Sequence, residues 1–219
     1  AAGVGAAPLD LSRVPLIVNT SVPPNIMVTL DDSGSMGWGF LPDGSNFAAN
    51  DCRYYDSSIN RIYFDPNADY PPPLRPDGTP FPNANYTAAW WDGFSTGQGT
   101  SDLRTAYRVS NDHQGAAPPY DTGWRTSGFP AGVASGSNQR AFYCVGNTVR
   151  LIQDEPALWP KFANWFSYYR IRSLAARTAL STAFARLDPS ARVAWQNYNS
   201  NQLAAGTQIR ELDIPAWRT

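Results

Sequence analysis

The feature that most constrains the fold is the uneven distribution of glycine, proline and aromatic residues along the 219-residue chain. The region 37–160 contains 13 of the 17 glycines, 13 of the 19 prolines, 20 of the 29 Phe, Tyr and Trp residues, and both cysteines. Glycine and proline interrupt helices and strands and favour turns. Since a structureless loop of this length is improbable inside a compact domain, we expect region 37–160 to be a large irregular insertion held by aromatic packing.

The residues that follow the insertion have the pattern of a helix. Region 161–188 contains no Gly or Pro, and its apolar residues recur at steps of three, four or seven. This spacing predicts one long amphipathic helix over 161–188, which ends before Pro189. Within 189–219, the segments Ala191–Tyr198 and Thr207–Leu212 have the composition of two strands.

A short apolar run, Asn25–Leu30, precedes the insertion and is bounded by Pro24 and by the turn Asp31–Ser35. Such a run is typical of a strand that is buried on both faces, which requires helices on each side of its sheet. We therefore expect an α/β fold with a Rossmann-type sheet, preceded by an extended arm over residues 1–24.

The charge balance excludes some classes of partner. The 17 basic and 18 acidic residues leave a formal net charge of −1, with no basic stretch. This argues against a nucleic-acid ligand and against attraction to anionic lipid. No apolar run reaches the roughly 18–20 residues that a transmembrane helix needs, so we expect no transmembrane segment.

The two cysteines, Cys52 and Cys144, are far apart and do not form a Cys-x-x-Cys pair. We favour a disulfide formed in an oxidising compartment. The alternative is two unrelated buried thiols.

The turn after the apolar run carries the strongest candidate for chemistry. Asp31, Ser33 and Ser35 offer one carboxylate and two hydroxyls from alternate residues, at the carboxyl end of the predicted strand. Ligands of α/β sheets bind at that end. Hard oxygen ligands suit a divalent cation, with Mg²⁺ preferred over Mn²⁺ or Ca²⁺. Because Asp, Ser and Gly are also common in ordinary turns, a plain strand-ending turn is the alternative.

Four segments of the chain resemble the N-terminal region of the PilY family of type IV pilus tip adhesins, which contains a von Willebrand factor A-like domain. They are VPPNIMVTLDDSGSM, RYYDSSINRIYFDP, NYTAAWWDG and NWFSYYRIRSLAARTALSTAF. The resemblance implies a protein that is exported through the periplasm to the cell surface, where it lies at the pilus tip. It also implies a metal-ion-dependent adhesion site at Asp31, Ser33 and Ser35, with minor pilins and a host or surface ligand as partners.

Only two predicted strands follow the helix, fewer than a complete sheet of that family contains. We therefore expect residues 1–219 to form one truncated von Willebrand factor A-like domain. The second and third loops that complete such an adhesion site cannot be assigned to residues here, so the site would bind its cation weakly.

The aromatic residues of the insertion allow two interpretations. Rigid aromatic side chains favour interfaces, and a partner surface would be formed by Trp38, Tyr54, Tyr55, Trp90, Trp91 and Trp124. Alternatively, these side chains fill a second core beneath the insertion.

Nothing in the sequence predicts an enzyme. His113, next to Asp112, is the single histidine, and no serine stands in a Gly-x-Ser-x-Gly motif, so the sequence disfavours a secreted hydrolase with a nucleophilic mechanism. The two functions that we consider are an adhesin and assembly factor that uses a cation site, and a structural module that caps a fibre and contacts minor pilins without using a cation.

Overall fold

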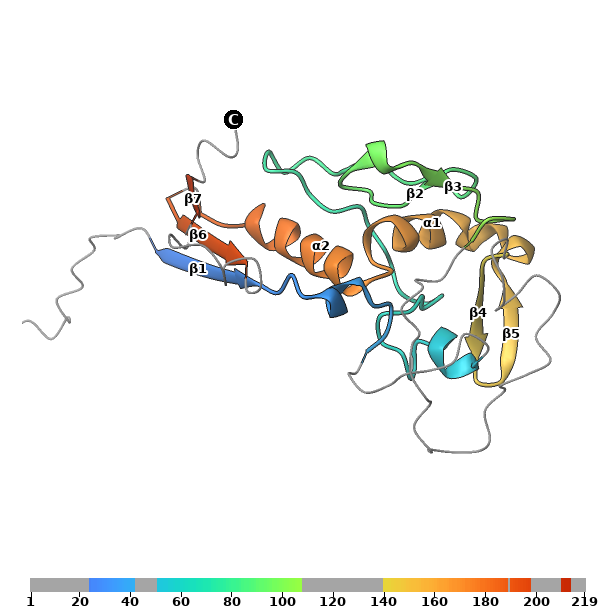
Figure 1. Cartoon of the computed structure of the whole chain (residues 1–219). Helices are drawn as coiled ribbons and strands as arrows, with labels where there is room; N and C mark the ends of the chain where they lie inside the picture. The colour runs from blue at the N-terminus through green and yellow to red at the C-terminus, as the bar shows by residue number, and fades with distance from the viewer. Residues whose placement is uncertain (1–23, 42–50, 108–139, 189, 198–209, 214–219) are drawn as a thin grey trace, which may run out of the picture.

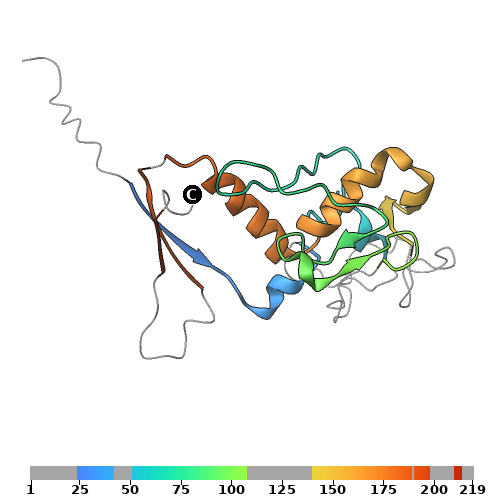
Figure 2. The same ribbon diagram turned by 90° about the horizontal axis from the view of Figure 1, so that it is seen from above.

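The computed structural model describes residues 24–41, 51–107, 140–188, 190–197 and 210–213 of the chain. This part of the chain is mixed α/β, with two α-helices and three small sheets. The largest sheet lies at one end of the molecule, the aromatic-rich region lies at the other, and the helices lie between them (Figures 1 and 2). The predicted arm, His113 and Trp124 fall outside the described residues, apart from Pro24.

The largest sheet contains β1 (Asn25–Leu30), β6 (Arg192–Asn197) and β7 (Arg210–Asp213), in the order β1-β6-β7. β1 and β6 are parallel and β6 and β7 are antiparallel. A parallel pair needs a long crossover connection, and here the crossover contains the insertion and both helices. The strands predicted at both ends of the chain and the mixed α/β class are confirmed. The von Willebrand factor A-like identity of the sheet stays a prediction.

The region predicted as one long helix forms two helices, α1 (Trp159–Tyr168) and α2 (Arg172–Phe184). α1 is the more deeply buried, because seven of its ten residues, from Phe162 to Tyr168, belong to the interior. α2 buries only Leu174 and Thr178. Neither helix, nor any other in the described ranges, has the length and apolar content to cross a membrane.

The prediction of a single helix over 161–188 is wrong because distant groups take the hydrogen bonds that would continue it. In an unbroken helix the amide of Arg172 would donate to the carbonyl of Tyr168. Instead, the amide of Arg172 donates to the carbonyl of Trp38 at 3.0 Å. The carbonyl of Tyr168 accepts from the hydroxyl of Thr178 at 2.7 Å. Ile171, between the helices, has an extended backbone.

β1 is less buried than the continuous apolar run predicts. Its residues alternate in exposure, with Met27 49% exposed and with Ile26, Val28 and Leu30 half-buried. The expectation of burial on both faces is therefore wrong for the described part of the chain. The apolar run needs packing elements on both sides to be covered, and in this part of the chain α2 lies to one side of the sheet (Figure 2).

Within the described ranges 37–41, 51–107 and 140–160, the insertion is built from short elements. Its two antiparallel pairs are β2 (Ala89–Trp90) with β3 (Thr100–Ser101), and β4 (Phe142–Val145) with β5 (Thr148–Leu151). Single 3₁₀ turns complete the structure: η1 (Gly34–Gly37), η2 (Cys52–Tyr55), η3 (Thr96–Gln98), η4 (Ile152–Asp154) and η5 (Pro156–Leu158).

Aromatic packing around α1 forms the main core, as the composition predicts. Tyr63 lies at its centre, with the ring of Trp165 at 4.9 Å and the ring of Tyr55 at 5.3 Å. The hydroxyl of Tyr63 pairs with that of Tyr107 at 2.9 Å and donates to the carbonyl of Phe142 at 2.7 Å. Burial raises the pKa of Tyr63 well above its usual value, because a phenolate would lose its water in this core.

The structure joins Cys52 to Cys144 in a disulfide, with 5.6 Å between the two Cα atoms. The bond ties η2 to β4, and both cysteines are buried in the aromatic core. The amide of Gly146, in the turn after β4, donates to the carboxylate of Asp56 at 2.6 Å. The described part of the insertion is therefore cross-linked and packed.

Candidate functional site

The turn that follows β1 brings two predicted ligands together. The hydroxyls of Ser33 and Ser35 form a hydrogen bond with each other, with 2.9 Å between their oxygen atoms. The amide of Ser33 donates to the carboxylate of Asp31 at 2.9 Å, and the amide of Met36 donates to the carbonyl of Ser33 at 3.0 Å. The bond from Met36 to Ser33 closes the turn at η1, and the hydrogen bond between the two hydroxyls keeps the side chains of Ser33 and Ser35 together.

The spacing of the two hydroxyls fits a small cation. Neighbouring ligands of an octahedral Mg²⁺ ion, each about 2.0–2.1 Å from the metal, are about 2.8–3.0 Å from one another. The distance between Ser33 Oγ and Ser35 Oγ lies within that range. Across the described residues, no group of three or more His, Cys, Asp or Glu side chains is placed to hold a metal. Any ion at this turn would therefore be held by the serine hydroxyls and by at most the two carboxylates of Asp31 and Asp32, a donor set that suits a hard ion with several bound waters.

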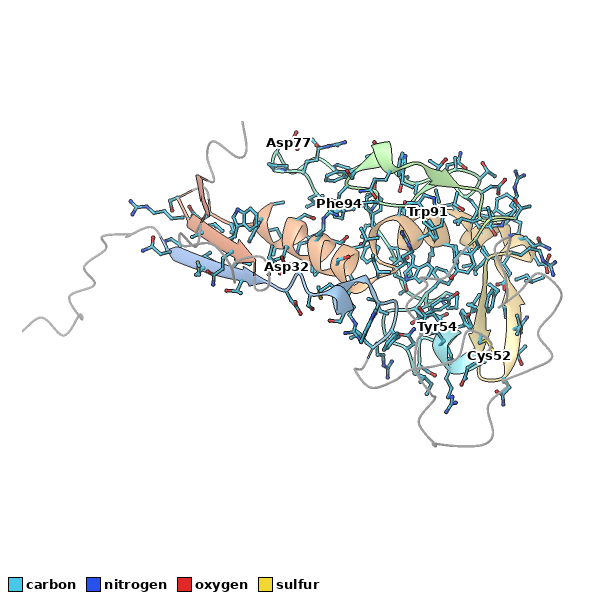
Figure 3. All side chains as sticks on the ribbon, viewed as in Figure 1. Asp32, Cys52, Tyr54, Asp77, Trp91 and Phe94 are labelled. Atoms are coloured by element: carbon cyan, nitrogen blue, oxygen red, sulfur yellow. A yellow bond between two sulfur atoms is a disulfide. The ribbon has the colours of Figure 1, made fainter. Side chains whose placement is uncertain are left out.

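A pocket of about 470 Å³ opens beside the turn, between the end of β1 and one side of α2. Asp32 lies there, where β1 ends and α2 passes (Figure 3). The turn contributes Asp31, Asp32, Ser33, Gly34, Met36 and Gly37 to the lining, β1 contributes Leu30, and α2 contributes Ser173, Ala176, Arg177 and Leu180.

Arg177 links this pocket to the insertion. Its Nη1 donates to Asp92 Oδ2 at 2.8 Å, and its guanidinium lies 4.3 Å above the ring centre of Phe94. The other carboxylate oxygen of Asp92 accepts the amide of Phe94 at 2.8 Å. The loop after β2 therefore fixes the position of the positively charged Arg177 side chain on the wall of the pocket. The sequence gives no local signal for this contact, because Arg177 and Asp92 are far apart in the chain.

The aromatic residues predicted as a partner surface divide into two groups. Tyr54 and Tyr55 are each 1% exposed, so they belong to the core and not to an exposed surface. Trp38, Trp90 and Trp91 are half-buried and pack against that core. Tyr54 and Tyr55 therefore follow the second interpretation of the sequence, in which the aromatics fill a core beneath the insertion. For the partly exposed Trp38, Trp90 and Trp91, the partner surface stays a prediction.

Fold and site together define a disulfide-linked α/β module with an oxygen-rich turn at the carboxyl end of its first strand. Comparison with known proteins finds no matching family model and no matching solved structure. It does find three curated relatives, each called type IV pilus biogenesis factor PilY1, from strains of Pseudomonas aeruginosa. The chain is 35% identical to the PilY1 of strain PAK over 214 residues and 34% identical to that of strain PAO1 over 212 residues.

These alignments include 92% of the chain, but the chain spans only 18% of the length of the relatives. The similarity therefore extends well beyond the turn and includes the insertion and the helices. The chain belongs to the PilY family of type IV pilus proteins.

Proposed function

We propose that this chain is a module of an exported factor that acts in the assembly of type IV pili and in adhesion at the pilus tip. The name of its relatives, type IV pilus biogenesis factor, supports the link to pili. The disulfide between Cys52 and Cys144 supports export, because such bonds persist in oxidising compartments. Minor pilins and a host or surface ligand are the proposed partners.

The proposed binding site is the turn after β1, where Asp31, Ser33 and Ser35 would hold a divalent cation. The observation that carries this assignment is the 2.9 Å separation of the two serine hydroxyls. An ion held by so few protein groups supplies positive charge and keeps coordination positions for the oxygen atoms of a partner. The chain's own contribution is to shape the turn through the backbone bonds of η1 and to place Ser33 and Asp31 in the lining of a pocket.

Thermal unfolding tests the cation site. We expect Mg²⁺ or Mn²⁺ to raise the Tm of the chain relative to EDTA, and we expect Asp31→Ala to abolish this shift. An ion at about 100 times its Kd stabilises by about 2.7 kcal/mol, which corresponds to a shift of several degrees. Asp77→Ala is a matched control, because Asp77 is also an exposed turn aspartate whose carboxylate accepts a nearby amide. An identical Tm with Mg²⁺ and with EDTA would disprove the cation site.

A second candidate function is structural, with the module capping the fibre and contacting minor pilins without a cation. The exposed side of the sheet favours this candidate, because Met27 is 49% exposed in the middle of β1. Under this alternative, Met27→Lys would impair pilus assembly while Asp31→Ala would not. Counting surface pili in cells that carry each variant separates the two functions.

A further inference from the structure

The pocket beside the turn is lined in large part by apolar residues. Leu30 stands at the end of β1, Met36 stands on the turn, and Ala176 and Leu180 stand on α2. The volume of about 470 Å³ lies in the range that is typical of small-molecule sites. A ligand that fills this pocket therefore needs an apolar part.

The polar residues of the lining give the pocket a negative charge. Asp31 and Asp32 bring two carboxylates, and Arg177 is the only basic residue in the described lining. Arg177 already pairs with Asp92, its Nη1 donating to Asp92 Oδ2 at 2.8 Å. Because that pair is neutral as a whole, the two carboxylates of the turn decide the sign. Charge complementarity then favours a positively charged occupant.

We propose that this pocket binds a lysine side chain of a partner protein when the turn holds no metal ion. The chain's only lysine, Lys161, lies in the first turn of α1 and pairs with Asp69 at 3.0 Å. The occupant therefore comes from another protein. This inference goes beyond the function proposed above, because it gives the pocket a ligand in the state without a cation.

The ammonium group of lysine matches the polar acceptors of the lining. Asp31 Oδ1 accepts the amide of Ser33 at 2.9 Å, whereas Asp31 Oδ2 accepts no hydrogen bond from the described residues. One available oxygen suits a compact ammonium better than a guanidinium, which pairs best with both oxygens of a carboxylate. The hydroxyls of Ser33 and Ser173 are further acceptors for the three N–H donors of the ammonium.

The four CH₂ groups of the lysine side chain match the apolar part of the lining. Lysine buries this stem along apolar surfaces while its charged end stays among polar groups. Met36 stands on the turn and Leu180 on α2, so a stem between them can contact both walls. Each CH₂ group removed from water raises the affinity about fourfold. An amine with a shorter stem should therefore bind more weakly.

The lysine and a divalent cation should exclude each other. Both need the carboxylate of Asp31, and a bound ion would place its positive charge beside the ammonium. By linkage, each ligand lowers the affinity of the other by the same factor. This exclusion rests on the cation site proposed above, whereas lysine binding itself does not. The concentration of the cation would then regulate binding of the partner.

A titration of the isotope-labelled 219-residue chain with short peptides, followed by NMR in EDTA, tests lysine binding. The probe is an acetylated, amidated hexapeptide of Gly and Ser that contains one Lys. Norleucine keeps the stem without the charge, and this replacement should weaken binding at least about tenfold. Replacement by 2,4-diaminobutyrate removes two CH₂ groups and should also weaken binding about tenfold.

Three results of this titration would overturn the proposal. The absence of saturable binding up to about 10 mM of the Lys peptide would overturn it entirely. Equal affinity for the Lys and norleucine peptides would overturn the role of the charge. Tighter binding of a peptide with Arg in place of Lys would overturn the choice of lysine.

Asp31→Asn tests the contact with the ammonium. We expect this variant to bind the Lys peptide at least about tenfold more weakly. Asp77→Asn is the matched control, because Asp77 is also an exposed turn aspartate whose carboxylate accepts an amide two residues further on, and it does not line the pocket. Unchanged peptide affinity in Asp31→Asn would overturn the assignment to this pocket.

Arg177→Gln should have the opposite effect. It removes a positive charge from the wall and releases the carboxylate of Asp92, so we expect the Lys peptide to bind roughly threefold or more tightly. Arg104→Gln is the matched control, because Arg104 is also a half-exposed arginine paired with an aspartate, Asp102, and does not line the pocket. Weaker peptide binding in Arg177→Gln would overturn the charge argument.

Repeating the titration in Mg²⁺ separates the lysine site from the cation site. If Mg²⁺ raises the Tm and weakens the Lys peptide at least about tenfold, both proposals stand. If Mg²⁺ raises the Tm and the peptide affinity is unchanged, the mutual exclusion is overturned. If Mg²⁺ leaves the Tm unchanged and the peptide binds in both conditions, the cation site fails and the lysine site stands. If Mg²⁺ raises the Tm and the peptide does not bind in EDTA, the lysine site fails and the cation site stands.

Discussion

The amide of Arg172 donates to the carbonyl of Trp38 at 3.0 Å, although Trp38 stands at the start of the insertion and Arg172 lies beyond its end in the sequence. The side chain of Arg172 reinforces this contact, since its Nε and Nη2 donate to the carbonyl of Phe40 at 2.9 and 2.8 Å. The start of α2 is thereby attached to the segment that leads out of the candidate site. This attachment places Ser173 and Arg177 opposite the turn, so the break between α1 and α2 is what forms the pocket.

The break between α1 and α2 also depends on Thr178, whose hydroxyl donates to the carbonyl of Tyr168 at 2.7 Å. We expect Thr178→Val to lower the free energy of unfolding by about 1–3 kcal/mol, because a buried carbonyl loses its donor while the volume of the side chain is kept. Thr178→Ser retains the hydroxyl and should cost less. Urea unfolding of both variants measures their free energies of unfolding. Equal losses in the two variants would show that the hydrogen bond from Thr178 does not contribute to stability.

Gly93 provides a second test of the contact between the insertion and α1. Its amide donates to the carbonyl of Ser167 at 2.9 Å, and a Cβ atom at this position would overlap the ring of Tyr168. We expect Gly93→Ala to cost about 1–3 kcal/mol, as overpacking of a core does. Gly97→Ala should be nearly neutral, because a Cβ atom there meets no atom within 4 Å. Similar melting temperatures for the two variants would contradict the packing described here.

The disulfide should contribute strongly to stability. It joins cysteines 92 residues apart, and closing a loop of that size stabilises by about 4–5 kcal/mol on the chain-entropy model. We expect the double variant Cys52→Ala, Cys144→Ala to lose most of that amount in chemical unfolding. Because both sulfurs are buried, mild reductant should leave the folded wild-type chain intact. Rapid reduction without unfolding, measured by thiol labelling, would contradict this burial.

The buried tyrosines should make the chain unstable in alkali. Burial raises the pKa of Tyr55 and Tyr63 well above the ordinary 10.0, and that of Tyr70 to about 12. Below pH 10 the folded and unfolded chains both keep these protons, so stability does not depend on them. Above pH 10 the unfolded chain releases protons that the folded chain retains, and the free energy of unfolding falls by about 1.4 kcal/mol per pH unit for each such tyrosine.

Unfolding curves between pH 8 and pH 11.5 measure this slope, and phenolate absorbance reports the ionisation directly. Tyr63→Phe removes one titrating group and should make the slope shallower by about one proton. A wild-type stability that stays constant up to pH 11.5 would show that the core tyrosines ionise without unfolding.

What the sequence could predict depends on the range of the interactions. The strand Asn25–Leu30 and the turn with Asp31, Ser33 and Ser35 are determined by neighbours in the sequence, and their positions are recognisable there. The broken helix is not recognisable, since Trp38 competes for a helical amide from a distant part of the chain. Periodicity records which residues are apolar but not which backbone groups find partners elsewhere.

In the candidate site, too, only the part that depends on neighbours in the sequence is predictable. The turn supplies its own geometry through bonds between residues at most three positions apart, such as that from the amide of Ser33 to Asp31. The opposite wall, with Ser173 and Arg177, comes from packing across the insertion and has no sequence signature. Composition likewise could not decide whether Tyr54 and Tyr55 are core or surface residues, because rigid aromatics serve both purposes.

The serine pair offers the most direct test of ligation at the turn. If Ser33 Oγ and Ser35 Oγ, 2.9 Å apart, bind one ion, then Ser33→Ala and Ser35→Ala should each weaken Mg²⁺ binding by about tenfold or more. Ser35→Thr retains a hydroxyl and should keep most of the affinity. Calorimetric titration of Mg²⁺ gives these values, and the Tm in EDTA serves as the control for folding. In the double variant only Asp31 remains as a ligand. Because the two serines share one ion, the loss of Mg²⁺ binding free energy in the double variant should be smaller than the sum of the losses in the two single variants. Serine variants that lower the Tm in EDTA but keep the Mg²⁺ affinity would instead make this pair a structural turn.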